Sequence, residues 1–443
     1  MPFFTSSDKA LWHLALPMIF SNITVPLLGL VDTAVIGHLD SPVYLGGVAV
    51  GATATSFLFM LLLFLRMSTT GLTAQAFGAK NPQALARALV QPLMLALGAG
   101  LLIALFRTPI IDVALHIVGG SEAVLEQARR FLEIRWLSAP ASLANLVLLG
   151  WLLGVQYARA PVILLIVGNI LNIVLDLWLV MGLHMNVQGA ALATAIAEYG
   201  TFFIGLWMVW HVLTMRGISV SLLKTAWRGN IRTLLALNRD IMLRSLLLQL
   251  CFGALTVFGA RLGPDIVAVN AVLMTLLTFT AYALDGFAYA VEAHSGQAYG
   301  ARESGQLRDV WRAACRQAGL VALAFALTYA CFGQQIIALL TSLPRLRELA
   351  GHYLIWQAIL PVVGVWCYLL DGMFIGATRG AEMRNSMAVA AAGFGLTLLT
   401  LPSLGNHGLW LALAVFLALR GLSLAFIWHR HWRRDTWFSS HHG

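Results

Sequence analysis

Long apolar stretches separated by short polar segments follow one another along almost the whole chain. Most reach about twenty residues, the length at which an α-helix crosses the hydrocarbon core of a bilayer. They are apolar on most faces, as helices in lipid are, whereas strands of a membrane barrel would alternate in pieces of about ten residues. The pattern therefore predicts twelve membrane-spanning helices, near residues 11–36, 45–67, 88–106, 131–153, 161–183, 188–213, 240–262, 265–290, 313–340, 353–376, 385–402 and 407–428.

The composition narrows the class of protein. Hydrophobic residues make up 59% and charged residues 11% of the 443 positions, whereas a soluble domain carries about a quarter charged residues. This excludes a soluble enzyme and a disordered protein. It also excludes a nucleic-acid binder despite the net charge of +9, because the basic residues lie in short segments between apolar runs. We expect an all-α polytopic membrane protein that is embedded in the lipid bilayer.

The basic residues are distributed unequally between the two sets of connecting segments. The positive-inside rule places the set richer in Lys and Arg in the cytoplasm. Both termini belong to that richer set, which agrees with an even number of crossings, so we expect both termini in the cytoplasm. The poorer set holds only Arg107, Arg129, Arg130, Arg261, Arg345 and Arg347.

A repeated motif marks an internal duplication. Residues 75–80 (QAFGAK) reappear 222 residues later as residues 297–302 (QAYGAR), and the same offset pairs Gly154 with Gly376. A repeat of six spans inserts both copies the same way up, which predicts two pseudo-symmetric six-helix bundles with a substrate path in the cleft between them. We divide the chain into an N-terminal six-helix lobe (1–213), a cytoplasmic linker (214–239), a C-terminal six-helix lobe (240–428) and a cytoplasmic basic tail (429–443).

No part of the sequence is built to use ATP. The only lysines, Lys9, Lys80 and Lys224, lack the phosphate-binding context G-x-x-x-x-G-K-[ST], and we predict no cofactor, no metal centre and no enzymatic activity. A secondary transporter needs instead a group at membrane depth that binds and releases H⁺ or Na⁺. Moving one such charge through 100 mV is worth about 2.3 kcal/mol.

Acidic residues inside the predicted spans are candidates for that group, because a charge at bilayer depth costs about 2.5–3.5 kcal/mol on insertion scales. Asp176 shares a helix face with Asn169 and Asn172, since residues three and four apart lie on one side of a helix. A carboxylate beside two amides can hold a proton or a small monovalent cation. The alternative is that this polar stripe only joins the helix to a neighbour, although such contacts rarely require an acid.

Asp32 lies in the first predicted span, which also contains Pro17 and Pro26. Proline removes a backbone hydrogen bond and allows a kink or hinge, so an acid that changes protonation on a bendable helix suits energy coupling. The alternative is that Asp32 lies near the helix end and reaches interfacial water. At the repeat offset Asp32 corresponds to Ala254, and Asp176 likewise corresponds to an apolar residue. The asymmetry favours a specialised site in the N-terminal lobe.

Further acids occur in the spans. Glu198, Asp285 and Asp371 are candidate cavity or coupling residues, whereas Glu292, near the predicted cytoplasmic end of its helix, is expected at a solvated rim. Three arginines inside the spans are candidate partners of these acids, with the pairing left open: Arg66, Arg244 and Arg420.

Three motifs resemble a known family: residues 30–37 (LVDTAVIG), the duplicated QA(F/Y)GA(K/R), and Asn172-x-x-x-Asp176. Over nearly its whole length the chain resembles the multidrug and toxic compound extrusion (MATE) transporters, in particular their DinF-like branch. The resemblance implies two six-helix lobes in a bacterial inner-membrane antiporter that exports small organic compounds. Two lobes in one chain are compatible with function as a monomer.

The resemblance also implies residue roles. Asp32 matches the family's helix-one aspartate, whose protonation is linked to bending of that helix, and Pro17 lies where the family's bending proline lies. Four residues match the polar cluster of the same lobe: the helix-five pair Asn172 and Asp176, the helix-six hydroxyl of Thr194 and, in a looser register, Asn145 on helix four.

We therefore predict a secondary multidrug antiporter that exports lipophilic or cationic organic compounds by alternating access, in exchange for protons. Sodium coupling is the first alternative, because Asp371 is similar to acids used by the sodium-coupled NorM-like branch. A lipid-linked oligosaccharide flippase of the same superfold would need a wide cationic cavity for pyrophosphate, and few arginines lie deep. A membrane enzyme acting on polyprenyl diphosphates would need paired acidic clusters for Mg²⁺, and a receptor would need a ligand-binding domain; the sequence shows neither.

Overall fold

A computed structural model describes residues 6–37, 42–229 and 231–438, without the side chains of residues 24–34 and 37. Every regular element in these ranges is helical, which confirms the predicted all-α membrane fold. The helices form two compact units, one made of the chain up to Asn22 and from Leu235 onward, the other of Ile23–Leu234. The boundary between Leu234 and Leu235 lies in the segment predicted to be the linker.

The unit Ile23–Leu234 contains the later part of α1 (Ser6–Gly37) and a series of shorter helices. Its other elements are α2 (Pro42–Leu61), α3 (Phe64–Gly78), α4 (Pro82–Leu105), α5 (Arg107–Val118), α6 (Glu122–Arg135), η1 (Trp136–Ser138), α7 (Ala139–Gly154), α8 (Arg159–Asp176), the π-helical η2 (Leu177–Gly182), α9 (Asn186–Met215) and α10 (Val220–Thr225).

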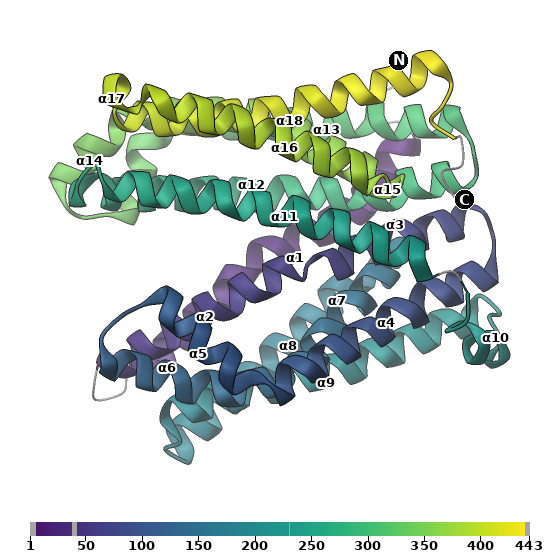
Figure 1. Ribbon diagram of the computed structural model, residues 1–443, viewed down its shortest axis with the longest axis horizontal. Helices are drawn as coiled ribbons and strands as arrows, with labels where there is room; N and C mark the ends of the chain where they lie inside the picture. The colour runs from purple at the N-terminus through teal and green to yellow at the C-terminus, as the bar shows by residue number, and fades with distance from the viewer. Residues whose placement is uncertain (1–5, 38–41, 230, 439–443) are drawn as a thin grey trace. The chain divides into compact units, whose positions relative to one another are not determined.

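The other unit contains the start of α1 and the longest helices, which run side by side in Figure 1. Its elements are α11 (Ile231–Ala260), α12 (Pro264–Gly300), α13 (Ser304–Leu340), α14 (Pro344–Gly351), α15 (Leu354–Gly376), α16 (Gly380–Thr397), η3 (Leu398–Thr400), α17 (Leu401–Leu404) and α18 (Asn406–Arg434).

The predicted spans are present as helices. Within the described residues, eleven helical segments are long and apolar enough to cross a membrane, and α1, with 32 residues, covers the remaining predicted span. Several helices continue past their apolar runs, and a polar side chain caps the start of two of these, α4 and α6. The hydroxyl of Ser121, for example, accepts the backbone N–H of Val124 and starts α6 nine residues before the apolar run at 131. The short helices α5, α10 and α14 were not predicted.

The duplicated motif adopts the same backbone conformation in both copies. α3 and α12 end at its glycines, Gly78 and Gly300. The basic residue two positions later has a left-handed backbone conformation in each copy, with φ of 54° at Lys80 and 57° at Arg302. A left-handed residue after a helix terminates it and turns the chain into the next element. The repeat therefore specifies where equivalent helices stop.

Equivalent glycines bring helices into close contact in each unit. A β-carbon at Gly150 of α7 would lie 2.7 Å from the carbonyl oxygen of Arg66 in α3, and one at Gly372 of α15 would lie 2.7 Å from that of Ala288 in α12. These distances leave no room for a side chain. Small residues of this kind let membrane helices approach until their backbones touch.

Gly372→Ala is expected to destabilise the protein by about 1–3 kcal/mol, because the added methyl group must push two helices apart. The matched control is Gly395→Ala on α16, where a β-carbon would meet nothing within 4 Å and the better helix propensity of alanine stabilises by up to about 1 kcal/mol. Thermal unfolding of the purified variants in detergent measures both. Equal melting temperatures for the two variants would contradict the close crossing.

The start of α1 packs within the unit that holds α12 and α13. The carboxylate of Asp8 accepts a hydrogen bond from Arg316 at 2.8 Å, the Trp12 ring lies 5.6 Å from that of Phe287, and Asn22 donates to the backbone oxygen of Tyr282 at 3.2 Å. The boundary between the two units therefore falls inside α1, next to Asn22. The helix backbone continues across it without interruption.

Candidate ion-coupling site

Asp176 is the last residue of α8 and is completely buried, with none of its surface exposed. The six residues that follow it, Leu177–Gly182, form a π-helix. π-Helical turns are rare and are frequently found at functional sites. The extra residue per turn changes the direction of side chains along the helix. Two independent features, burial and irregular geometry, therefore coincide at this acid.

The neighbouring polar residue on α8 connects to α9. Asn172 is 8% exposed, and its Oδ1 lies 3.4 Å from the hydroxyl of Thr194, which also lies 3.1 Å from the backbone oxygen of Ala190. The structure thus brings together Asn172 of α8 and Thr194 of α9. Asn172 lies one helical turn before Asp176. Asn169, which begins the predicted polar stripe, is half-buried one turn further along α8.

A second polar group lies one turn along α9 from Thr194. Glu198 accepts a hydrogen bond from Asn145 Nδ2 of α7 at 3.1 Å, and its other carboxylate oxygen lies 3.7 Å from Arg135 Nη2 at the end of α6. The Arg135 guanidinium also donates to Ser138 at 2.6 Å. Asn145, which the family resemblance matched only loosely, therefore lies in the same region as the other predicted residues. The Glu198 carboxylate is held by the Arg135 cation and the Asn145 amide.

Two of the predicted residues on α1 fall where the structure describes the backbone alone. The side chains of Asp32 and Pro26 lie outside the described residues, although the α1 backbone is helical at both positions. Pro17 is half-buried within the part of α1 that packs in the other unit. The unit boundary at Asn22 therefore lies between the two predicted hinge prolines.

The acids of the other unit have a different environment. Asp371 of α15 is 7% exposed, and its Oδ2 accepts hydrogen bonds from Arg244 of α11 at 2.7 Å and from Arg420 of α18 at 2.5 Å. Both arginines are buried as well. Asp285 of α12 is half-buried and interacts electrostatically with the same two arginines. The negative charge of Asp371 is therefore fully compensated in this structure.

Two details differ from the sequence-based predictions. The expectation that Glu292 lies at a solvated rim is wrong: it is 2% exposed, because α15 crosses α12 at this point and Gly376 packs against its backbone oxygen. The pairing of Glu198 with Arg135 was not foreseen, although the signal was available, since Arg135 is a charged residue inside a predicted span. Within the described ranges, no three His, Cys, Asp or Glu residues are grouped to hold a metal ion.

Comparisons with known proteins agree with the fold and the repeat. The profile of the MatE family matches residues 17–178 and 241–402, one match in each half. The chain is 86% identical over 440 residues to DNA damage-inducible protein F of Escherichia coli (strain K12), covering 99% of this chain and 96% of that protein. It is 24% identical to the probable multidrug resistance protein NorM of Acinetobacter baylyi, covering 95% of this chain and 94% of the relative.

Solved structures share the whole fold at low sequence identity. A MATE structure described as the straight conformation superposes with a TM-score of 0.85 at 21% identity, covering 98% of each chain. A MOP superfamily transporter from Pyrococcus furiosus superposes with a TM-score of 0.82 at 22% identity, again over 98% of each chain. The arrangement of helices described above is therefore one that known transporters adopt.

Proposed function

Because this chain belongs to the MatE family, whose members are transporters, we propose that it is a proton-coupled secondary antiporter that exports lipophilic or cationic organic compounds. In this proposal it acts as a monomer in the bacterial inner membrane, with both termini in the cytoplasm. Asp176 and Asp32 carry the coupling protons, and Asn172 and Thr194 position Asp176. The observation that carries the proposal is the complete burial of Asp176 beside the Asn172–Thr194 contact.

Burial makes Asp176 sensitive to its protonation state. A carboxylate in surroundings of low dielectric constant loses its hydration, and this cost disappears when it binds a proton. Protonation therefore changes the free energy of the buried arrangement, whereas a carboxylate exposed to water would change little. This sensitivity is what allows a proton gradient to perform mechanical work.

The environment of Asp371 supports placing the coupling site in the unit Ile23–Leu234. A carboxylate that accepts hydrogen bonds from two arginines is already neutralised, and protonating it would remove the charge that both buried cations contact directly. Asp371 is therefore poorly suited to cyclic protonation. We assign it a structural role, which holds α11, α15 and α18 together.

The proposed conformational change uses α1 as its hinge. Protons from the outside neutralise Asp32 and Asp176, and α1 bends near Pro17 and Pro26. This bending reshapes the N-terminal lobe so that the exported compound is released outward. Protons then leave to the cytoplasm, where the next compound binds. The position of the unit boundary inside α1 favours this helix as the mobile element, because proline removes backbone hydrogen bonds that resist bending.

Reconstituted vesicles test the proposed function. A panel of fluorescent lipophilic cations is offered to protein-containing vesicles on which a proton gradient or a sodium gradient is imposed separately. We expect uptake of dye to follow the proton gradient alone and to cease when a protonophore collapses it. The oxygen atoms of Asp176, Asn172 and Thr194 could also bind a sodium ion. Uptake that follows only the sodium gradient would therefore replace proton coupling with sodium coupling.

Thr194→Ala is expected to lower proton-driven dye transport about fivefold, because loss of one part-buried hydrogen bond of about 1 kcal/mol removes the contact that fixes the Asn172 side chain next to the turn of Asp176. The matched control is Thr201→Ala on the same helix. Thr201 makes the same hydrogen bond to the backbone four residues earlier, at 2.9 Å. Among the side chains that the structure describes, it has no partner of the kind that Asn172 provides for Thr194. Initial rates in vesicles measure both variants, and equal rates would contradict the role of Thr194.

A further inference from the structure

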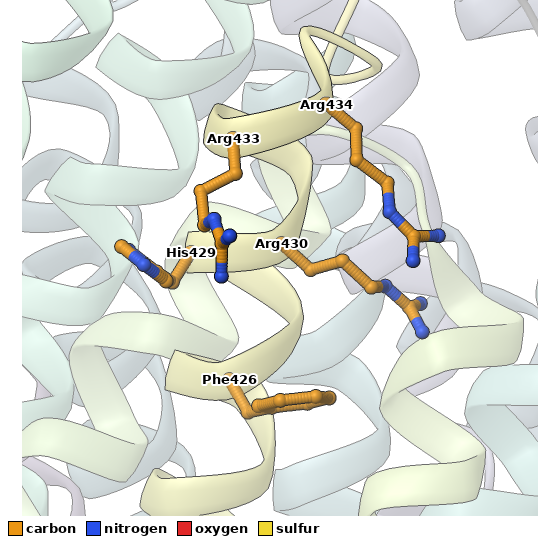
Figure 2. Close-up of a pocket in the computed structure, with 5 residues that line it drawn as sticks. All are labelled: Phe426, His429, Arg430, Arg433 and Arg434. Atoms are coloured by element: carbon orange, nitrogen blue, oxygen red, sulfur yellow. The ribbon is translucent and has the colours of Figure 1, made fainter.

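The last turns of α18 form a basic pocket outside the proposed coupling site. A cavity of about 270 Å³ is lined there by one aromatic and four basic side chains. Figure 2 shows these side chains, which all come from this one helix: Phe426, His429, Arg430, Arg433 and Arg434.

The pocket lies at the end of an apolar stripe. Leu422 and Phe426 are 66% and 67% exposed, and Arg430 and Arg434 continue the same spacing of four residues, which keeps all four side chains on one face with about 6 Å between successive ones. Figure 2 shows Phe426, Arg430 and Arg434 extending to the same side of the helix. Because α18 is one of the membrane-crossing segments, this face changes from apolar to cationic where the helix leaves the hydrocarbon region.

The charges of the pocket are not compensated by acids. Within residues 6–37, 42–229 and 231–438, none of the pocket arginines Arg430, Arg433 and Arg434 forms an ion pair within 4.0 Å. Neighbouring arginines at this end of the unit behave differently, since Arg379 pairs with Glu382 and Arg384 with Asp240. Cations at the end of a helix interact favourably with its dipole, which explains their sign. Arg433 and Arg434 are exposed, so their N–H groups are accessible to an anionic ligand.

We propose that this pocket binds the phosphate headgroup of an anionic phospholipid in the membrane leaflet at this end of α18. Arg430 and Arg434 are one turn apart and donate to the phosphate oxygens, for which the planar guanidinium is well suited. Phe426 and Leu422 contact the glycerol backbone and the acyl chains below the headgroup. A soluble anion would use the cations alone, whereas the continuous apolar stripe matches a molecule with an apolar portion.

The positive-inside reading places this end of α18 in the cytoplasmic leaflet, where a row of basic residues next to a membrane helix attracts anionic lipids. The site would anchor the end of α18, the helix that also supplies Arg420 to the Asp371 cluster. The proposal does not depend on which ion drives transport. Failure of the gradient experiment therefore leaves it untouched, and the reverse also holds.

Native mass spectrometry of the detergent-purified full chain tests the site. We expect retention of phosphatidylglycerol but not of phosphatidylcholine. The double variant Arg430→Gln/Arg434→Gln should bind phosphatidylglycerol about thirtyfold more weakly, since each basic residue near an anionic surface contributes about fivefold. The matched control removes the same charge from exposed positions elsewhere, as Lys224→Gln/Arg228→Gln, and should bind it like the wild type. Equal losses in the two double variants would overturn the proposal, because they would indicate unspecific attraction.

Two further arms separate a lipid site from a site for free anions and guard against misfolding. Phe426→Ala should weaken retention of phosphatidylglycerol, and inorganic phosphate in excess should not displace the lipid from the wild type. Displacement by phosphate, together with normal retention by Phe426→Ala, would overturn the lipid assignment. Arg430→Lys/Arg434→Lys preserves the charge and the fold, and should bind phosphatidylglycerol more weakly than the wild type because lysine cannot donate two parallel hydrogen bonds. Unchanged binding in both Arg430→Gln/Arg434→Gln and Arg430→Lys/Arg434→Lys would also overturn the proposal.

Discussion

Asp176→Asn is expected to abolish proton-driven accumulation of the exported dye while the protein still folds and inserts. A gradient equivalent to 100 mV supplies about 2.3 kcal/mol per proton, enough for a roughly fiftyfold concentration ratio. The amide of asparagine has nearly the shape of a protonated carboxyl group but cannot release a proton. The variant should therefore reach a ratio near one, which is the level of passive equilibration. Dye accumulation in vesicles under an imposed proton gradient measures this ratio.

The control for this experiment makes the same chemical change where no coupling is expected. Asp112 of α5 is an exposed acid of the same unit that pairs with Arg129, and Asp112→Asn should transport like the wild type. Asp32→Asn should lose accumulation as Asp176→Asn does, because both acids are proposed to take up protons. Full accumulation by Asp176→Asn would show that the coupling proton binds elsewhere.

Asp371→Asn is expected to destabilise the protein by about 3–5 kcal/mol, because it removes the charge of the carboxylate that the buried Arg244 and Arg420 both contact directly. The effect should appear as a large fall in the melting temperature of the purified protein in detergent. The fraction that remains folded should still respond to a proton gradient, which distinguishes a structural acid from a coupling acid.

A matched control and a rescue test the reason for this loss. Asp265 pairs with Arg345 at 2.5 Å, but the two side chains are 41% and 80% exposed, so Asp265→Asn should cost no more than about 1 kcal/mol. Replacing the whole cluster, as Arg244→Met/Asp285→Leu/Asp371→Leu/Arg420→Met, should recover much of the stability, since a packed apolar set avoids unpaired charges. A normal melting temperature for Asp371→Asn would contradict the role assigned to the cluster.

Features that depend on neighbours along the chain were predictable from the sequence. The helices follow apolar runs of the required length, and the duplicated motif locates equivalent helix ends, as at Gly78 and Gly300. The shared face of Asn172 and Asp176 follows from helical periodicity. These predictions succeed because hydrophobic length and periodicity are local properties that the bilayer converts directly into structure.

Contacts between distant segments were not predictable in the same way. Arg244 and Asp371 are 127 residues apart in the sequence, and periodicity does not tell which helix faces meet. The same limit applies to Arg135 and to Glu292, whose burial depends on where α15 crosses α12. The π-helix after Asp176 has no signal of its own in an apolar stretch such as Leu177–Gly182.

Coupled transport requires one property of Asp176: it must exchange a proton when an exported compound binds. Purified protein in weakly buffered detergent, with a pH-indicator dye, measures protons released when a transported cation is added. We predict release by the wild type and by Asp112→Asn, and a clear reduction for Asp176→Asn at equal occupancy by the cation. The same number of protons released by Asp176→Asn as by the wild type would contradict the assignment of Asp176 as the proton-exchanging group.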